Sequence, residues 1–91
     1  MKLEEIKYTR TLQNINIILK HLQDDSVITQ IKNEIHLLSQ TEKYGLRSIR
    51  EISKEEFNIM LHKGFIRRLQ SSNNRFVYGI TPSGASHLAT S

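Results

Sequence analysis

Positively charged side chains are concentrated in one part of this sequence. Residues 1–46 contain six basic and six acidic side chains, whereas residues 47–75 contain seven basic and three acidic ones and so carry the entire formal charge of +4. The end of the second segment has no Asp or Glu and contains the cations Lys63, Arg67, Arg68 and Arg75. Such a cluster is typical of a surface that binds a polyanion, most simply the phosphates of nucleic acid. The alternative is that one or two of these cations protect the edge of a β-sheet from aggregation.

The other chemically active side chains form no recognisable catalytic or metal site. The chain has no cysteine, and its histidines stand singly, at His21, His36, His62 and His87. No two of them have the spacing of metal ligands, and no serine lies in a nucleophile elbow or beside a phosphate-binding glycine loop. We therefore predict that the protein is not an enzyme, and we expect no catalytic residue, metal or cofactor.

The length and composition predict one small domain. A chain of 91 residues is close to the size at which a single hydrophobic core suffices without disulfides or metals. The N-terminal sequence MKLEEIKYTR is charged where a signal peptide needs apolar residues, and no segment has the apolar length needed to cross a bilayer. Together with the lack of cysteine, these features favour a cytoplasmic protein with no membrane partner.

Apolar residues in the first half recur at helical spacing. The first stripe consists of Leu12, Ile15, Leu19 and Leu22, and the second consists of Ile28, Ile31, Ile35 and Leu38. Steps of three and four residues are those of one buried helical face, so we predict helices over residues 9–22 and 26–40. Residues 41–52 contain Gly45 and no clear period, and we predict irregular structure or a short helix there.

A third helix has both a start signal and a stop signal. Ser53 and Glu56 have the spacing of a capping box, in which the serine hydroxyl and the glutamate carboxylate satisfy backbone amides of the first helical turn. Gly64 is suited to the left-handed conformation that commonly ends a helix. These signals predict a helix over residues 53–63.

The remaining residues predict a hairpin and a short closing helix. Two runs of β-forming residues within 65–80 flank a polar turn that contains Asn73 and Asn74, and asparagine tolerates the positive φ that tight turns need. A Thr-Pro step at Pro82 is typical of a helix start and predicts a helix over residues 82–89. The predicted fold class is therefore mainly α with a small antiparallel β-hairpin.

The order of these elements and two motifs resemble the winged-helix superfamily. LHKGFIRR resembles the junction between helix and hairpin in that superfamily, and VYGITPSGASHL resembles its ending. The resemblance covers residues 53–88 and is weak before them. ISKEEFNIMLHKGFI is similar to small bacterial and phage-borne proteins of the YjcQ type. The resemblance implies a single winged helix-turn-helix domain over residues 1–91, with the hairpin as its wing.

In that superfamily the helix before the wing usually enters the major groove, while the wing contacts the backbone or the minor groove. The resemblance thus implies sequence-specific binding of duplex DNA by a small transcriptional regulator. The implied DNA-binding residues are Lys54, Asn58, His62, Lys63, Arg67, Arg68, Asn73, Asn74 and Arg75. Asparagine suits adenine and lysine suits guanine. The alternative is an ordinary solvated helix face, which Glu55 and Glu56 favour because carboxylates repel phosphates.

A second copy of this chain is an expected partner. A single helix and wing bury little surface, so we expect a homodimer, with the helix over residues 9–22 in the contact because Ile17 lies away from its apolar stripe.

The alternative function is a winged-helix protein-interaction module, of phage or mobile-element origin, that does not bind DNA directly. In that case Glu55 and Glu56 would recognise a basic partner.

Overall fold

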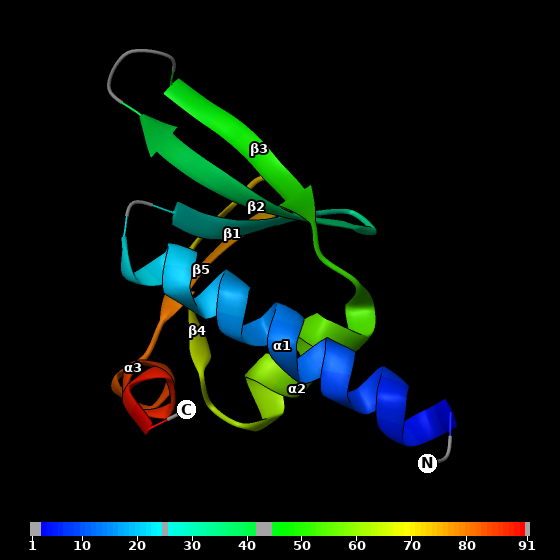
Figure 1. Cartoon of the computed structure of the whole chain (residues 1–91). Coiled ribbons are helices and arrows are strands. Elements are labelled where there is room, and N and C mark those ends of the chain that lie inside the picture. Colours follow the sequence, from blue (N-terminus) through cyan, green and yellow to red (C-terminus); the bar gives the residue numbers. More distant parts are fainter. Residues whose placement is uncertain (1–2, 25, 42–44, 91) are drawn as a thin grey trace.

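The computed structural model of the chain describes residues 3–24, 26–41 and 45–90 and has an α+β fold (Figure 1). Its elements follow in the order α1 (Leu3–Gln23), β1 (Ser26–Ile31), β2 (Glu34–Thr41), β3 (Gly45–Glu51), α2 (Lys54–His62), β4 (Ile66–Ser72), β5 (Arg75–Ile80) and α3 (Pro82–Thr90). The five strands form one sheet in the order β3-β2-β1-β5-β4, and all neighbouring strands are antiparallel. The central strand is therefore β1, and β3 and β4 are the edges.

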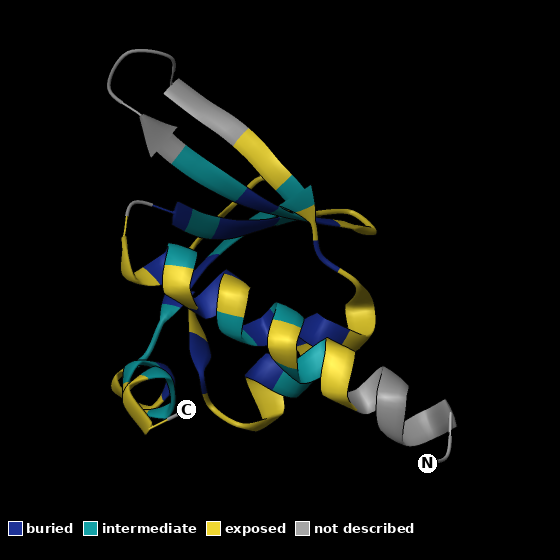
Figure 2. Ribbon diagram, in the orientation of Figure 1, coloured by how far each residue is buried: buried dark blue, intermediate teal, exposed yellow. Residues whose placement is uncertain are grey.

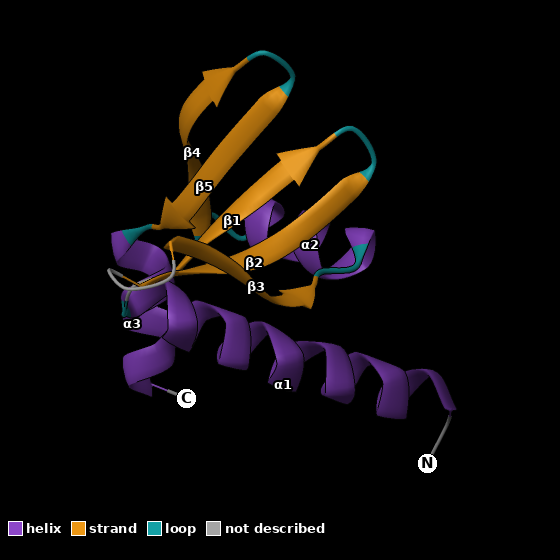
Figure 3. Ribbon diagram, turned by 90° about the horizontal axis from the view of Figure 1, so that it is seen from above, coloured by secondary structure: helices purple, strands orange, loops and turns teal. Residues whose placement is uncertain are grey.

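Helices cover one face of this sheet and leave the other face open. The ring of Tyr78 on β5 meets the ring of Phe57 on α2 edge to face, with centroids 4.9 Å apart, so the face that carries Tyr78 is the covered one. Seen from above, the strands lie in front of α2 and no helix crosses over them (Figure 3). Side chains alternate between the two faces along a strand. Every second residue of a strand therefore belongs to the open face.

The core lies between the sheet and the helices that cover it (Figure 2). Its buried apolar residues are Ile15, Ile18, Leu19, Leu22, Ile28, Ile35, Leu37, Ile52, Phe57, Met60, Phe65, Ile66 and Tyr78. Full burial of one large apolar side chain stabilises a fold by about 1.5–3 kcal/mol. This cluster joins α1 and α2 to the sheet, and it gives the strands a fixed register because a slip of one residue would turn its members to the open face.

The prediction of a mainly α fold is wrong, as is the helix predicted over residues 26–40. That segment forms β1 and β2, joined by a two-residue turn. Ile28 and Ile35 are buried in the core, but Ile31 is 45% exposed. Ile31 and Leu38 point to the open face, so the supposed stripe is divided between two faces. The segment is rich in β-branched residues, which pack well on a pleated sheet, and its helical spacing is a coincidence.

The prediction for residues 41–52 is also wrong in the part that the structure describes. Gly45–Glu51 is strand β3, which pairs with β2 from Thr41↔Gly45 to His36↔Glu51. Residues 42–44 lie outside the described residues. Since three strands follow α1, where a helix-turn-helix requires another helix, the winged helix-turn-helix arrangement is corrected to a two-layer α+β fold.

The local signals of the second half coincide with the elements they predict. The Ser53 hydroxyl accepts the backbone N–H of Glu56 at 3.1 Å, and the Glu56 carboxylate accepts the backbone N–H of Ser53 at 3.0 Å, so the capping box is present at the start of α2. Gly64 follows the helix with a φ of 73°. The β4–β5 hairpin and α3 occupy the expected residues, and the helix predicted over residues 9–22 lies within the longer α1.

Candidate nucleic-acid interface

The β4–β5 hairpin has a tight turn made by two asparagines. Asn73 and Asn74 both have positive φ, 41° and 67°. Consecutive positive φ values are those of the turn type that matches the twist of a two-stranded hairpin. Farther along, the register shifts by one residue between Arg68 and Gln70, so Leu69 forms a bulge in the edge strand. The turn and the edge strand of the hairpin are thus defined by its own residues, while the pairing of β5 with β1 joins the hairpin to the rest of the sheet.

The arginines of this hairpin lie on both of its faces. Arg68 pairs with Tyr78 and so belongs to the covered face, where its guanidinium carbon lies 5.6 Å from the centroid of the Phe76 ring. Such a cation–π contact is worth about 0.5–1 kcal/mol at an exposed site, so it orients the side chain without immobilising it. Arg67 and Arg75 belong to the open face. An anion can therefore meet a guanidinium group from either side of the hairpin.

No described acidic residue neutralises these cations. Arg67 and Arg68 are exposed and Arg75 is half-buried. Within the described residues, the ion pairs join Glu34 to His36 and Arg50 to Glu56, and neither involves the hairpin. A guanidinium group carries five N–H donors in a planar fork that matches the geometry of phosphate. The hairpin therefore offers charged donors to a phosphate.

The outward face of α2 carries the predicted base-reading residues. Lys54, Asn58, His62 and Lys63 are all exposed. A shallow pocket of about 550 Å³ is lined by Glu55, Asn58, Ile59, His62 and Lys63. Its amide, imidazole and ammonium groups can hydrogen-bond to base edges or phosphates. The same side chains also fit an ordinary solvated helix face, because no described contact holds them in a fixed orientation.

Glu56 is not on the outward face of α2. The residue is 5% exposed, one carboxylate oxygen accepts from the Ser53 backbone and hydroxyl at 3.0 Å, and the other lies 3.7 Å from a guanidinium nitrogen of Arg50. Glu56 is therefore unavailable to a basic partner, and it presents no carboxylate to DNA. Glu55 is the one acidic residue exposed on α2.

The predicted site residues form two groups, one near the base of the hairpin and one at its turn. Lys63 caps the C-terminus of α2 and is followed, after Gly64, by the start of β4. The turn at Asn73 and Asn74 lies at the far end of the hairpin. Since a strand rises about 3.3 Å per residue, seven residues of β4 separate the groups by about 20 Å. The structure therefore brings Arg75 together with the turn asparagines, and it places Arg67 and Arg68 near the base of the hairpin, at the end where Lys63 and α2 lie.

The predicted site omits Lys32, a cation that lies beside the hairpin turn. Lys32 is exposed in the turn between β1 and β2, and the residue before it, Ile31, pairs with Arg75. Sequence analysis placed Lys32 inside a helix. The one signal that points to its real position is the polar pair Lys32-Asn33 between VITQI and EIHLL, because asparagine is common in turns.

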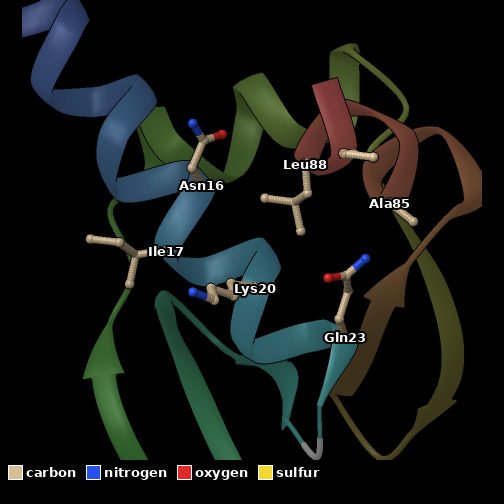
Figure 4. A pocket seen from close by; sticks show the side chains of 7 residues that line it. Asn16, Ile17, Lys20, Gln23, Ala85 and Leu88 are labelled. Atoms are coloured by element: carbon tan, nitrogen blue, oxygen red, sulfur yellow. The ribbon is translucent and has the colours of Figure 1, made fainter. Parts of the chain in front are cut away.

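An apolar groove separates α1 from α3 on another part of the molecule. It has a volume of about 460 Å³ and is lined by Asn16, Ile17, Lys20, Gln23, Ala85, Leu88 and Ala89. Leu88 points from α3 towards α1, whereas Ile17 is directed away from α3 (Figure 4). Ile17 is 50% exposed, which agrees with its predicted position outside the apolar stripe of the helix.

No protein-family model, curated protein or solved structure matches this chain. No relative therefore indicates a function, and the residues and their arrangement are the basis for proposing one. None of the described helices is both long and apolar enough to span a membrane. Among the described residues, no group of three or more His, Asp or Glu side chains is placed to hold a metal ion.

Proposed function

We propose that this chain binds duplex DNA, with the β4–β5 hairpin on the phosphate backbone, and acts as a small cytoplasmic transcriptional regulator. The observation that supports this proposal is the set of guanidinium groups of Arg67, Arg68 and Arg75 on the edge hairpin of the sheet, where no described carboxylate pairs with them. Phosphate contacts of this kind supply most of the sequence-independent affinity of DNA-binding proteins. Sequence reading is assigned to Lys54, Asn58 and His62 on α2.

The positions of Phe57, Phe65, Phe76 and Tyr78, the aromatic residues whose burial the structure describes, favour a duplex over single-stranded nucleic acid. Proteins that bind single strands usually stack bases on exposed aromatic rings. Here Phe57, Phe65 and Tyr78 are buried, and Phe76 is half-buried beneath Arg68. These rings serve the core and offer no stacking platform, so the anion is better supplied by a double-stranded backbone.

The test is the salt dependence of binding to a duplex of random sequence. We expect a Kd on the order of 10⁻⁴ to 10⁻⁶ M near physiological salt, with tighter binding at lower salt. Arg67→Ala and Arg68→Ala should each lower the slope of log K against log salt by about 0.9, the value for one lost phosphate contact. Arg10→Ala is the matched control, because Arg10 is an exposed cation on α1, away from the hairpin. Equal slopes for all four proteins would exclude the hairpin as the binding surface.

We also propose a homodimer with α1 in the contact. The supporting observation is the exposed side chain of Ile17 beside the apolar groove between α1 and α3. Replacing Ile17 by Glu should shift the protein from dimer to monomer in sedimentation at micromolar concentration without unfolding it. A wild-type protein that sediments as a monomer would contradict the dimer and leave DNA binding by the monomer untouched.

A protein-interaction module is the second candidate function. It is favoured by two large apolar side chains on the sheet, Ile31 at 45% and Leu69 at 53% exposure. Recognition of a basic partner by α2 would have to use Glu55, because Glu56 is buried. A wild-type chain that shows no salt-sensitive DNA binding at low ionic strength would favour this function over the first.

A further inference from the structure

We infer that the β1–β2 turn is a second phosphate-binding element that acts beside the β4–β5 turn. The two turns together are called the two-turn tip, which consists of Lys32, Asn33, Asn73, Asn74 and Arg75. This inference rests on the proposed binding of duplex DNA. It extends that binding to a cation, Lys32, on a different hairpin from the arginines.

The pairing of β1 with β5 places the two turns side by side. Ile31 is the last residue of β1 and pairs with Arg75, the first residue of β5, so both turns leave the sheet at the same end. The view from above shows both turns projecting in the same direction (Figure 3). In the strand order β2-β1-β5-β4 their centres are two strand spacings apart, which is roughly 10 Å.

The two-turn tip consists of hydrogen-bond donors and cations. Lys32, Asn33, Asn73 and Asn74 are exposed, and Arg75 is half-buried. The nearest acidic residue along the chain is Glu34, whose carboxylate lies 3.5 Å from a ring nitrogen of His36, farther along β2 on the open face. Its carboxylate is therefore turned along the strand towards an imidazole. Ammonium, guanidinium and amide groups remain at the tip, and each of them can donate to phosphate oxygens.

Lys32 stands in a backbone conformation that is unfavourable for lysine. Its φ is 55°, within the left-handed region that costs most residues about 1–2 kcal/mol and that glycine or asparagine normally occupies. The neighbouring turn has asparagines at both of its positive-φ positions. A residue held in such a conformation motivates a functional hypothesis. Here the conformation fixes a cation at the apex of a turn, where its side chain can leave the sheet.

The separation of the turns suits a duplex. Double-stranded DNA carries one phosphate charge per about 1.7 Å of helix axis, so two cationic turns roughly 10 Å apart can each meet a phosphate without distortion of the duplex. Each additional contact releases counterions and steepens the salt dependence by about 0.9. Lys32 and Arg75 should therefore contribute separately and additively to the measured slope.

The experiment compares Lys32→Asn, Arg75→Ala, the double variant and Arg10→Gln in salt titrations with a random-sequence duplex. Asparagine tolerates positive φ, so Lys32→Asn removes the charge while it preserves the turn. We expect Lys32→Asn and Arg75→Ala each to lower the slope by about 0.9, the double variant to lower it by about 1.8, and Arg10→Gln, at an exposed cation on α1, to leave it unchanged. Lys32→Gly is a second variant that keeps the same backbone, and it should lower the slope equally.

The outcomes separate this inference from the proposed function. A wild-type slope for Lys32→Asn and Lys32→Gly, together with a lowered slope for Arg75→Ala, would overturn the second phosphate contact and leave DNA binding by the β4–β5 hairpin intact. A lowered slope for Arg10→Gln would also overturn it, since any surface cation would then have the same effect. An absence of salt-sensitive binding by the wild-type chain would remove both.

Discussion

The β1–β2 and β4–β5 hairpins are neighbours in one sheet, but they turn in different ways. The β4–β5 turn uses two asparagines with positive φ, whereas in the β1–β2 turn only Lys32 has positive φ. The β4–β5 turn consists of residues that prefer its conformation, so the sequence predicts it. The β1–β2 turn contains a lysine, which avoids that conformation, and the apolar residues that flank this turn have helical spacing. A hairpin can thus be predicted from sequence only where its turn residues are of types that favour the backbone conformation of the turn.

The largest expected effect concerns which residues of β2 face the core. The helical stripe predicts that Leu38 is buried, whereas the sheet buries Leu37 completely and leaves Leu38 half-buried on the other face. Leu37→Ala should lower the free energy of unfolding by about 2–5 kcal/mol. Leu38→Ala should cost about 1 kcal/mol. Urea unfolding of both variants checks this, and a greater loss for Leu38→Ala would support a helix in place of β2.

A smaller effect is expected at the asparagine turn. Asn74 has a φ of 67°, so Asn74→Ala places a less tolerant residue in the left-handed region and should destabilise the protein by about 1–2 kcal/mol. Asn74→Gly is the control, since glycine adopts this conformation freely and should change the stability little. If both variants unfold at the wild-type urea concentration, the turn does not depend on the backbone preference of asparagine.

The smallest expected change in stability is at Lys32, and its sign distinguishes the β1–β2 turn from a helix. In the observed turn, Lys32→Gly relieves the positive φ but adds backbone freedom to the unfolded chain, so we expect a change between zero and about 1 kcal/mol in the stabilising direction. Glycine inside a helix would instead destabilise by about 1 kcal/mol. The sign of the shift in the urea midpoint decides between them, and a clear loss of stability would contradict the β1–β2 turn.

The second half of the fold could be predicted because its signals are local. Ser53 and Glu56 cap a helix through hydrogen bonds within one turn, and Gly64 follows with the positive φ that its type permits. Such signals depend on neighbours in the sequence alone. The first half depends on the pairing of β1 with β5, which joins residues more than 40 positions apart, for example Ile31 and Arg75. No local pattern indicates that pairing.

The residues of the candidate site also differ in whether local sequence signals or long-range strand pairing determine their positions. Arg67, Arg68 and Arg75 could be assigned to a hairpin from sequence, because the Asn73-Asn74 turn defines that hairpin. Lys32 could not be assigned to the same surface, since its position there follows from the long-range pairing of β1 with β5. Charge counting locates cations along a chain, but only the sheet topology shows which of them share a surface.

NMR titration is the most direct test of whether the β4–β5 hairpin is the surface that binds DNA. Backbone amide shifts of the whole chain would be followed as a random-sequence duplex is added at low and at physiological salt. We expect changes at Arg67, Arg68 and the Asn73-Asn74 turn that weaken as salt rises, with none along the α1–α3 groove around Ile17. Changes confined to that groove, or none at low salt, would contradict it.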